Sequence, residues 1–278
     1  MMLTFESAKF NNPSLEILAE ALKKGLKANY QEVTVEIINC PNLREWNCPS
    51  EGISGNERII DVGGESTRPG AASVSVEEEC RRILPVVEAL VEGNVPVSVD
   101  TRHAEVMMAG LSAGARIIND VSALTHDQKS LEVAATHGAD VILMHMRGSP
   151  DTMAGHTTYR DVVSEVRGFL QGRLKTCWEA GIRAERICVD PGIGFAKTPS
   201  QNFELLDRLQ ELTVLQLPIL VGVSRKFGLD KPPTERLDYS VSLAIRAIEN
   251  GARLVRVHDL AATRSALDTW LCQRNEVK

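Results

Sequence analysis

Three polar side chains lie where runs of β-branched and aliphatic residues end. They are Asp100, Asn119 and Asp190. A carboxylate accepts two hydrogen bonds side by side, and an Asn side chain both donates and accepts. The set therefore suits a planar ligand edge that carries an amino group beside a ring N–H. A lone Asp at such a position more often caps the helix that follows it. Three such residues on one edge favour ligand binding.

Basic side chains follow other runs, although the protein as a whole is acidic. The chain carries a formal net charge of −6, and the basic candidates are Arg68, Lys226, Arg256 and His258. Their convergence indicates a local site for an anion, and a forked Arg suits phosphate oxygens better than a flexible Lys does. Arg256 has an alternative interpretation as the ion-pair partner of Asp259 or Glu249.

Seven short apolar runs, each ending in a polar or charged residue, must position these groups. The runs are 58–61, 97–100, 117–120, 141–145, 187–190, 219–224 and 254–258. Such runs are typical of parallel strands buried on both faces, and polar residues at their C-terminal ends indicate a functional rim. The sequence therefore predicts an α/β fold of the TIM (β/α)8 type, and 278 residues suffice for one such barrel.

A helical pattern follows most of these strands. The predicted helices run over 77–90, 104–113, 129–136, 161–180, 202–212 and 240–250. Several end in a glycine at the expected C-cap position, namely Gly114, Gly138, Gly181 and Gly251. The repeated order of strand, loop, helix and glycine turn predicts parallel pairing through right-handed crossovers.

Residues 1–57 do not follow this order. We expect a helix over 14–30, a β-like run over 33–39 and a polar loop after it, with no helix before Arg58. Residues 1–57 are therefore predicted to form an N-terminal appendage. Residues 58–278 are predicted to form a barrel that lacks or replaces its first βα unit.

Composition limits the classes of partner. Lys and Arg are scattered along the chain, so no surface for nucleic acid or anionic membrane is expected. The six cysteines lack the paired short spacing of zinc sites, which favours reduced thiols. With no signal-peptide pattern and no apolar run of about 18 residues, the expected location is the cytoplasm.

From Ile59 nearly to the C-terminus, the sequence resembles dihydropteroate synthase, the pterin-binding TIM-barrel family of folate biosynthesis. The shared motifs are Asp61–Gly70, Ser98–Thr101, Ile117–Asp120, Leu143–Met146, Asp190–Phe195, Ser224–Lys226 and Arg256–His258. The resemblance implies a transferase that joins p-aminobenzoate to a hydroxymethyl-dihydropterin pyrophosphate. It also implies magnesium as the accompanying ion, with a homodimer as a family expectation.

The resemblance implies roles for individual residues as well. Contacts to the pterin are expected from Asp100, Asn119, Met144, Asp190, Gly194, Phe195 and Lys226. Contacts to the pyrophosphate and p-aminobenzoate are expected from Thr67, Arg68, Ser224, Arg225, Arg256 and His258. Among these, Lys226, Arg256 and His258 are the expected catalytic residues.

The chain departs from the family at its first strand. The family's Asn-Val-Thr-Pro-Asp-Ser-Phe loop, whose Asn binds magnesium, is absent from the sequence. Residues 10–64 instead resemble the N-terminal stretch of a zinc-dependent ester hydrolase family, but the His ligands of that family are missing. Alternatively, the run 33–39 fills the empty strand position and places Asn39 at the magnesium site.

Two other functions remain open at this point. One is a pterin-binding protein without catalysis, because the loop that closes over the reaction centre is missing. The other is a relative of the cobalamin-linked methyltetrahydrofolate methyltransferases. These share the pterin-binding barrel but lack the Glu-Ser-Thr-Arg-Pro-Gly loop that this chain contains at 65–70.

Overall fold

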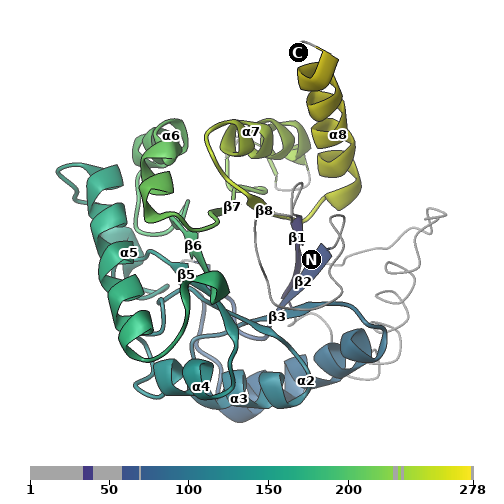
Figure 1. Ribbon diagram of the computed structural model, residues 1–278, viewed down its shortest axis with the longest axis vertical. Helices are drawn as coiled ribbons and strands as arrows, with labels where there is room; N and C mark the ends of the chain where they lie inside the picture. Colours follow the sequence, from purple (N-terminus) through teal and green to yellow (C-terminus); the bar gives the residue numbers. More distant parts are fainter. Residues whose placement is uncertain (1–33, 40–57, 69, 228–230, 233–234, 277–278) are drawn as a thin grey trace.

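The computed structural model describes residues 34–39, 58–68, 70–227, 231–232 and 235–276 (Figure 1). Most of the predicted appendage, and with it most of the hydrolase-like stretch, lies outside these residues. No helix in the described part of the chain is long and apolar enough to cross a membrane. Cys80, Cys177, Cys188 and Cys272 form no disulfide bond among the described residues, whereas Cys40 and Cys48 lie outside them.

Eight strands form one sheet in the order β6-β5-β4-β3-β2-β1-β8-β7. The strands are β1 (Thr34–Asn39), β2 (Arg58–Gly63), β3 (Val97–Asp100), β4 (Ile117–Asp120), β5 (Asp140–Met144), β6 (Ile187–Asp190), β7 (Leu220–Gly222) and β8 (Leu254–Val257). Neighbours from β2 to β6 are parallel, as are β7 and β8. A parallel bridge between Val189 and Ile219 joins the two ends of this order, so the sheet closes into a barrel.

Strand β1 is the exception in direction. It lies between β2 and β8, in the position of the missing first strand, but it is antiparallel to both. Thr34 pairs with Gly63 and Asn39 pairs with Arg58, so β1 runs from the C-terminal end of β2 toward its N-terminal end. Consecutive antiparallel strands need no crossover helix, which fits a sequence without one.

Helices surround the strands on the outside (Figure 1). They are α2 (Val76–Glu92), α3 (Ala104–Ser112), α4 (Ser130–Thr136), α5 (Val162–Glu179), α6 (Pro199–Asp207), α7 (Leu237–Glu249) and α8 (Leu260–Glu276). Short 3-10 helices are η3 (Met153–Gly155), η4 (Ala184–Arg186) and η5 (Leu209–Leu215). The glycines predicted to end four helices, Gly114, Gly138, Gly181 and Gly251, all adopt positive φ.

Most predicted elements differ from the structure by one to three residues at an end, and two differ in ways that have a clear cause. The helix expected over 202–212 begins earlier, because the Thr198 side chain and the Gln201 side chain cap each other's backbone N–H. It ends as α6 at Asp207 and is followed by η5. The strand expected over 219–224 is shorter, and only Leu220–Gly222 pairs with β8.

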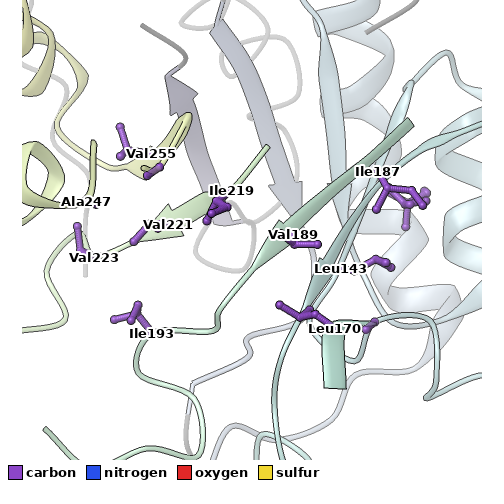
Figure 2. Close-up of a cluster of buried hydrophobic side chains, with 14 of the residues drawn as sticks. Leu143, Leu170, Ile187, Val189, Ile193, Ile219, Val221, Val223, Ala247 and Val255 are labelled. Carbon is purple, nitrogen blue, oxygen red and sulfur yellow. The ribbon is translucent and has the colours of Figure 1, made fainter. Parts of the chain in front are cut away.

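The strands alternate between two apolar layers. One set packs outward against the helices, and Figure 2 shows part of it, with Val189, Val221 and Val255 from strands near Leu170 of α5 and Ala247 of α7. A second cluster holds one residue each from six strands: Ile59, Ile117, Ile142, Cys188, Leu220 and Leu254. Because side chains in a strand alternate between faces, this second set is the inward-facing layer of the barrel.

Candidate active site

The site residues belong to the next inward layer of the same strands. Two residues after each member of the inward apolar layer come Asp61, Asn119, Met144, Asp190, Gly222 and Arg256. Parallel strands bring these positions together at the C-terminal rim of the barrel. The same alternation that buries the apolar layer therefore directs three carboxylate or amide groups and one guanidinium toward a shared centre.

Arg256 is the centre of a buried polar cluster. Its Nη1 donates to Oδ2 of Asp61 at 3.1 Å and to Oδ2 of Asp100 at 3.2 Å. Asn119 Nδ2 donates to the same Asp61 oxygen at 2.9 Å. Arg256 is only 6% exposed, so its charge is compensated by carboxylates and not by water. Asp61 thus links a residue predicted to read the pterin with one predicted to hold the pyrophosphate.

The two alternative partners of Arg256, Asp259 and Glu249, bind other groups in the structure, and Glu249 accepts a hydrogen bond of 2.9 Å from Trp270 Nε1. Asp259 pairs with Arg225 instead, through contacts of 2.8 Å and 3.1 Å. Arg225 also has a positive φ of 59°, and its backbone N–H donates to Ser240 Oγ. The structure therefore places the Arg225 side chain in an ion pair that fixes its own loop.

Asp190 lies buried at the end of β6. Its Oδ1 accepts a hydrogen bond of 2.7 Å from the backbone N–H of Gly192. Burial raises the pKa of the Asp190 carboxyl, while the charges of Arg256 and Lys226 act in the opposite direction. A carboxylate in this position gains strongly from two N–H donors of a ligand, because such donors stabilise its charged form.

Lys226 lies over the loop that follows Asp190. Its Nζ donates to the carbonyl oxygen of Ile193 at 2.7 Å and is 4.6 Å from the centre of the Phe195 ring. Gly194 has a φ of +85°, and a Cβ there would lie 3.1 Å from Lys226 Cδ. Glycine is required at this position because both the backbone angle and the Lys226 side chain exclude a larger residue.

His258 and Ser224 meet beyond the ends of β8 and β7. The backbone N–H of His258 donates to Ser224 Oγ at 3.2 Å, and its ring Nδ1 lies 3.0 Å from the same oxygen. Ser224 is buried, so its hydroxyl holds the His258 ring in a defined orientation. The two residues are brought together as the sequence predicted.

Met144 and Phe195 share an apolar cluster at the rim. Val121, Met146, Met153 and Ala196 complete this cluster. Its position beside Asp190 gives the site an apolar wall next to its polar centre. This is the arrangement that a flat heterocycle with one polar edge requires.

Two predicted residues of the rim, Thr67 and Arg68, lie in the segment after β2. Thr67 is partly exposed and Arg68 is exposed.

Asn39 is not brought to this rim. It pairs with Arg58 and Val255, near the starts of β2 and β8, because β1 runs in the opposite direction. The strand direction therefore separates Asn39 from Asp100, Asn119 and Asp190.

Sequence reasoning gave no role to Lys197, which is buried beneath the site. Its Nζ donates to the carbonyl oxygens of Gly192 and Phe195, each at 2.9 Å, and lies 3.0 Å from His145 Nδ1. Burial lowers the pKa of Lys197 to about 7 and that of His145 to about 2. His145 is therefore neutral, and Lys197 holds the 192–195 loop against β5. The sequence feature that could have indicated this role is the position of Lys197 directly after the segment that contains Gly192 and Gly194.

The comparisons with known proteins agree with this geometry. The sequence profile of the pterin binding enzyme family matches residues 52–258. A dihydropteroate synthase of Synechocystis is 47% identical over 216 residues, which cover 76% of this chain and 75% of the relative.

Solved structures match as well. The Xanthomonas albilineans dihydropteroate synthase with 4-aminobenzoic acid is 44% identical with a TM-score of 0.73, covering 78% of this chain and 79% of the other. The Burkholderia cenocepacia dihydropteroate synthase complexed with 7,8-dihydropteroate is 43% identical with a TM-score of 0.74, covering 79% and 82%. The fold and site are those of a pterin-binding barrel enzyme. Within that class, the chain belongs to the dihydropteroate synthase family.

Proposed function

We propose that this protein condenses p-aminobenzoate with hydroxymethyl-dihydropterin pyrophosphate to give dihydropteroate and pyrophosphate. The observation that carries the proposal is the buried cluster of Arg256 with Asp61, Asp100 and Asn119 at the rim. It sets an anion-binding guanidinium directly beside acceptors for a pterin edge. The names of the relatives, which include structures with 4-aminobenzoic acid and 7,8-dihydropteroate, support the same reaction.

The pterin ring is held at the centre of the rim. Asp100, Asn119 and Asp190 accept and donate along its amino and ring N–H edge. Lys226 approaches from the 192–195 loop, and the Met144–Phe195 cluster provides the apolar wall. These groups are fixed by strands and by buried hydrogen bonds, so little reorganisation accompanies binding.

The reaction exchanges one bond for another at the exocyclic carbon of the pterin. The bond from this carbon to the pyrophosphate oxygen breaks, and the oxygen leaves with the electron pair. The amine nitrogen of p-aminobenzoate then bonds to the carbon and loses a proton. Arg256 and His258 stabilise the charge of the departing pyrophosphate, because donors aimed at developing charge lower the barrier. Thr67, Arg68 and Ser224 lie at the side where the amine arrives.

Magnesium belongs to the proposal as an ion that arrives with the pyrophosphate. Among the described residues, no group of three or more His, Cys, Asp and Glu side chains is arranged to hold a metal. This fits Mg²⁺, which is often bound through substrate phosphates and one or two carboxylates. The proposal also includes a cytoplasmic location, which the lack of a signal-peptide pattern in the sequence favours, and a homodimer, which the resemblance implies.

A pyrophosphate-release assay tests the proposal. With both substrates and Mg²⁺, the protein should release one pyrophosphate per dihydropteroate formed, and omission of p-aminobenzoate should abolish dihydropteroate formation. Binding of the pterin without any product would support the alternative of a non-catalytic pterin-binding protein, which the absent first loop favours. The methyltransferase alternative has no support, because the 65–70 loop is present and the relatives are synthases.

A further inference from the structure

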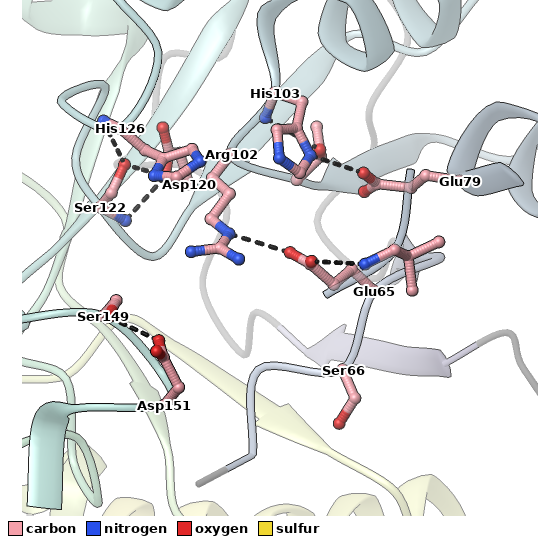
Figure 3. A network of polar contacts seen from close by, with 12 residues as sticks. Glu65, Ser66, Glu79, Arg102, His103, Asp120, Ser122, His126, Ser149 and Asp151 are labelled. Atoms are coloured by element: carbon pink, nitrogen blue, oxygen red, sulfur yellow. Dashed lines mark hydrogen bonds and ion pairs between the residues drawn. The ribbon is translucent and has the colours of Figure 1, made fainter. Parts of the chain in front are cut away.

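One carboxylate fastens the segment that carries Thr67 and Arg68 at both of its ends. Glu65 lies two residues beyond the end of β2 and is only 8% exposed. Its Oε1 accepts a hydrogen bond of 3.1 Å from the backbone N–H of Val74, and its Oε2 accepts one of 2.9 Å from Arg102 Nε. Figure 3 shows Glu65 between these two donors. The described residues between these contacts, 66–68 and 70–73, are thereby joined at both ends at the rim.

The start of this loop is fixed independently. A Cβ on Gly64 would lie 2.9 Å from Cγ of Glu79 and 3.0 Å from its carbonyl oxygen, so the backbone presses against α2. Arg82 Nη1 donates to the Gly64 carbonyl oxygen at 3.0 Å. Gly64 is therefore firmly held at the start of the loop. Among the described hydrogen bonds, the one from the Val74 N–H to Glu65 is the only one that joins the two ends of the loop.

Arg102 connects Glu65 to neighbouring rim loops. It lies two residues beyond the end of β3 and is mostly buried. Asp120 at the end of β4, His126 of the loop after β4 and Asp151 of the loop after β5 lie nearby (Figure 3). The Arg102 and Glu65 side chains are both largely shielded from solvent where they meet, so their ion pair is stronger than an exposed one.

We propose that the Glu65–Arg102 ion pair is a positioning device for the p-aminobenzoate side of the site, holding Thr67 and Arg68 in place. This inference rests on the proposed function. Ordering a flexible loop at the moment of binding costs conformational entropy, which a pre-closed loop avoids. The pterin side is held separately, by Arg256 and by the strands. Loss of the ion pair should therefore affect one substrate and spare the other.

The test compares Glu65→Gln, Arg102→Met and the double variant. Gln keeps the size of Glu65 and an acceptor for Val74 but removes the charge. The KM for p-aminobenzoate should rise about tenfold in each single variant, as expected for loss of a charge-assisted hydrogen bond, while the dissociation constant for the pterin pyrophosphate stays within about twofold. The double variant should resemble either single one, because both remove the same interaction.

Glu179→Gln is the matched control, because Glu179 forms an exposed ion pair with Lys175 on α5 and has no contact with the 66–73 loop among the described interactions. It should change neither constant. Equal losses for both substrates, additive effects of the two single changes, or an unchanged KM in Glu65→Gln would overturn the proposal.

Hydrogen exchange of residues 66–73 without substrates separates this inference from the proposed function. If the ion pair holds the loop, exchange there should be faster in Glu65→Gln than in the unaltered protein, whereas Glu179→Gln should match the unaltered protein. Unchanged exchange overturns the tether itself. Faster exchange in a protein that turns over neither substrate shows that the tether exists and that the proposed reaction is what failed.

Discussion

Strand β1 and the seven parallel strands all form hydrogen-bonded pairs within the sheet, but they differ in which of their residues lie at the rim. In β2 to β8 the chain runs toward the rim, so the inward residue after the apolar layer lies at the rim, as Asp61 and Asp190 do. Strand β1 pairs along its whole length with β2, yet its last residue, Asn39, lies at the opposite end. Closing a barrel and supplying its chemistry are therefore separate demands on a strand.

The difference has a direct consequence for the missing first loop of the family. A loop that follows a parallel first strand would leave from the rim, whereas the chain after Asn39 leaves from the far end of the barrel. The described part of this protein thus contains the residues proposed to bind the pterin at the ends of the parallel strands, but not that loop. The following predictions test this contrast, beginning with the largest expected effect.

The first prediction replaces residues 1–57 with a first strand, loop and helix of a typical synthase. Turnover should rise by at least about a hundredfold, because the restored loop positions substrate and excludes water. The dissociation constant for the pterin should change by less than about threefold, since the residues proposed to bind the pterin are already present in the parallel strands. The measurement is kcat for pyrophosphate release. No gain in a folded hybrid would mean that the present N-terminal segment already performs the role of the loop.

The second prediction concerns Asp61, the polar residue of β2 that lies in the site. Asp61→Ala should lower the free energy of unfolding by about 2 kcal/mol, because Arg256 loses one of its buried carboxylates and Asn119 loses its acceptor. Chemical denaturation measures this loss. Asp268→Ala, which breaks an exposed pair with Arg264 on α8, should cost less than about 0.5 kcal/mol. Equal costs for the two variants would contradict the central place of Asp61.

The third prediction concerns pH and the loops beside the site. The hydrogen bond that His103 Nδ1 donates to the Glu79 carboxylate is the largest cause that raises the pKa of His103. A group whose pKa is higher in the folded state stabilises the protein below its unfolded pKa, and this contribution disappears as pH rises through the folded pKa. His103→Gln should therefore cost about 1 kcal/mol near pH 5.5 and almost nothing near about pH 8.5. A cost independent of pH would rule out the charged pair.

The fourth prediction, with the smallest effect, addresses Asn39. Because Asn39 lies at the far end of the barrel, Asn39→Ala should leave the Mg²⁺ concentration for half-maximal activity within about twofold of its original value. A tenfold increase would mean that Asn39 reaches the pyrophosphate, and the contrast between β1 and the parallel strands would then fail.

Much of the barrel follows from local sequence. The bounds of β3, β4 and β6 agree with the predicted runs. A short run of β-branched and aliphatic residues that ends in Asp is typical of a buried parallel strand. The four glycines after helices were predictable because positive φ is costly for other residues. The inward direction of Asn119 and Asp190 follows from the period of two.

Other features depend on contacts that no local pattern encodes. The alternation in Thr34–Asn39 predicts a strand but not its direction, since the period of two reads the same both ways. One partner of Arg256 is Asp61, which is 195 residues away, whereas the alternative partners suggested by the sequence, Asp259 and Glu249, lie within a few residues of it. Arg225 likewise is a plausible anion ligand by type, but the fold places Asp259 beside it. Such pairs are set by the closure of the barrel.

Calorimetric titration of a pterin into the unaltered protein and into Asp190→Ala tests the central claim most directly. If the ends of the parallel strands form the pterin site, the unaltered protein binds the pterin and the variant loses at least about 2 kcal/mol, roughly thirtyfold in affinity, because buried ring donors lose a charged acceptor. Unchanged affinity in a folded Asp190→Ala variant would contradict the account and place the pterin elsewhere.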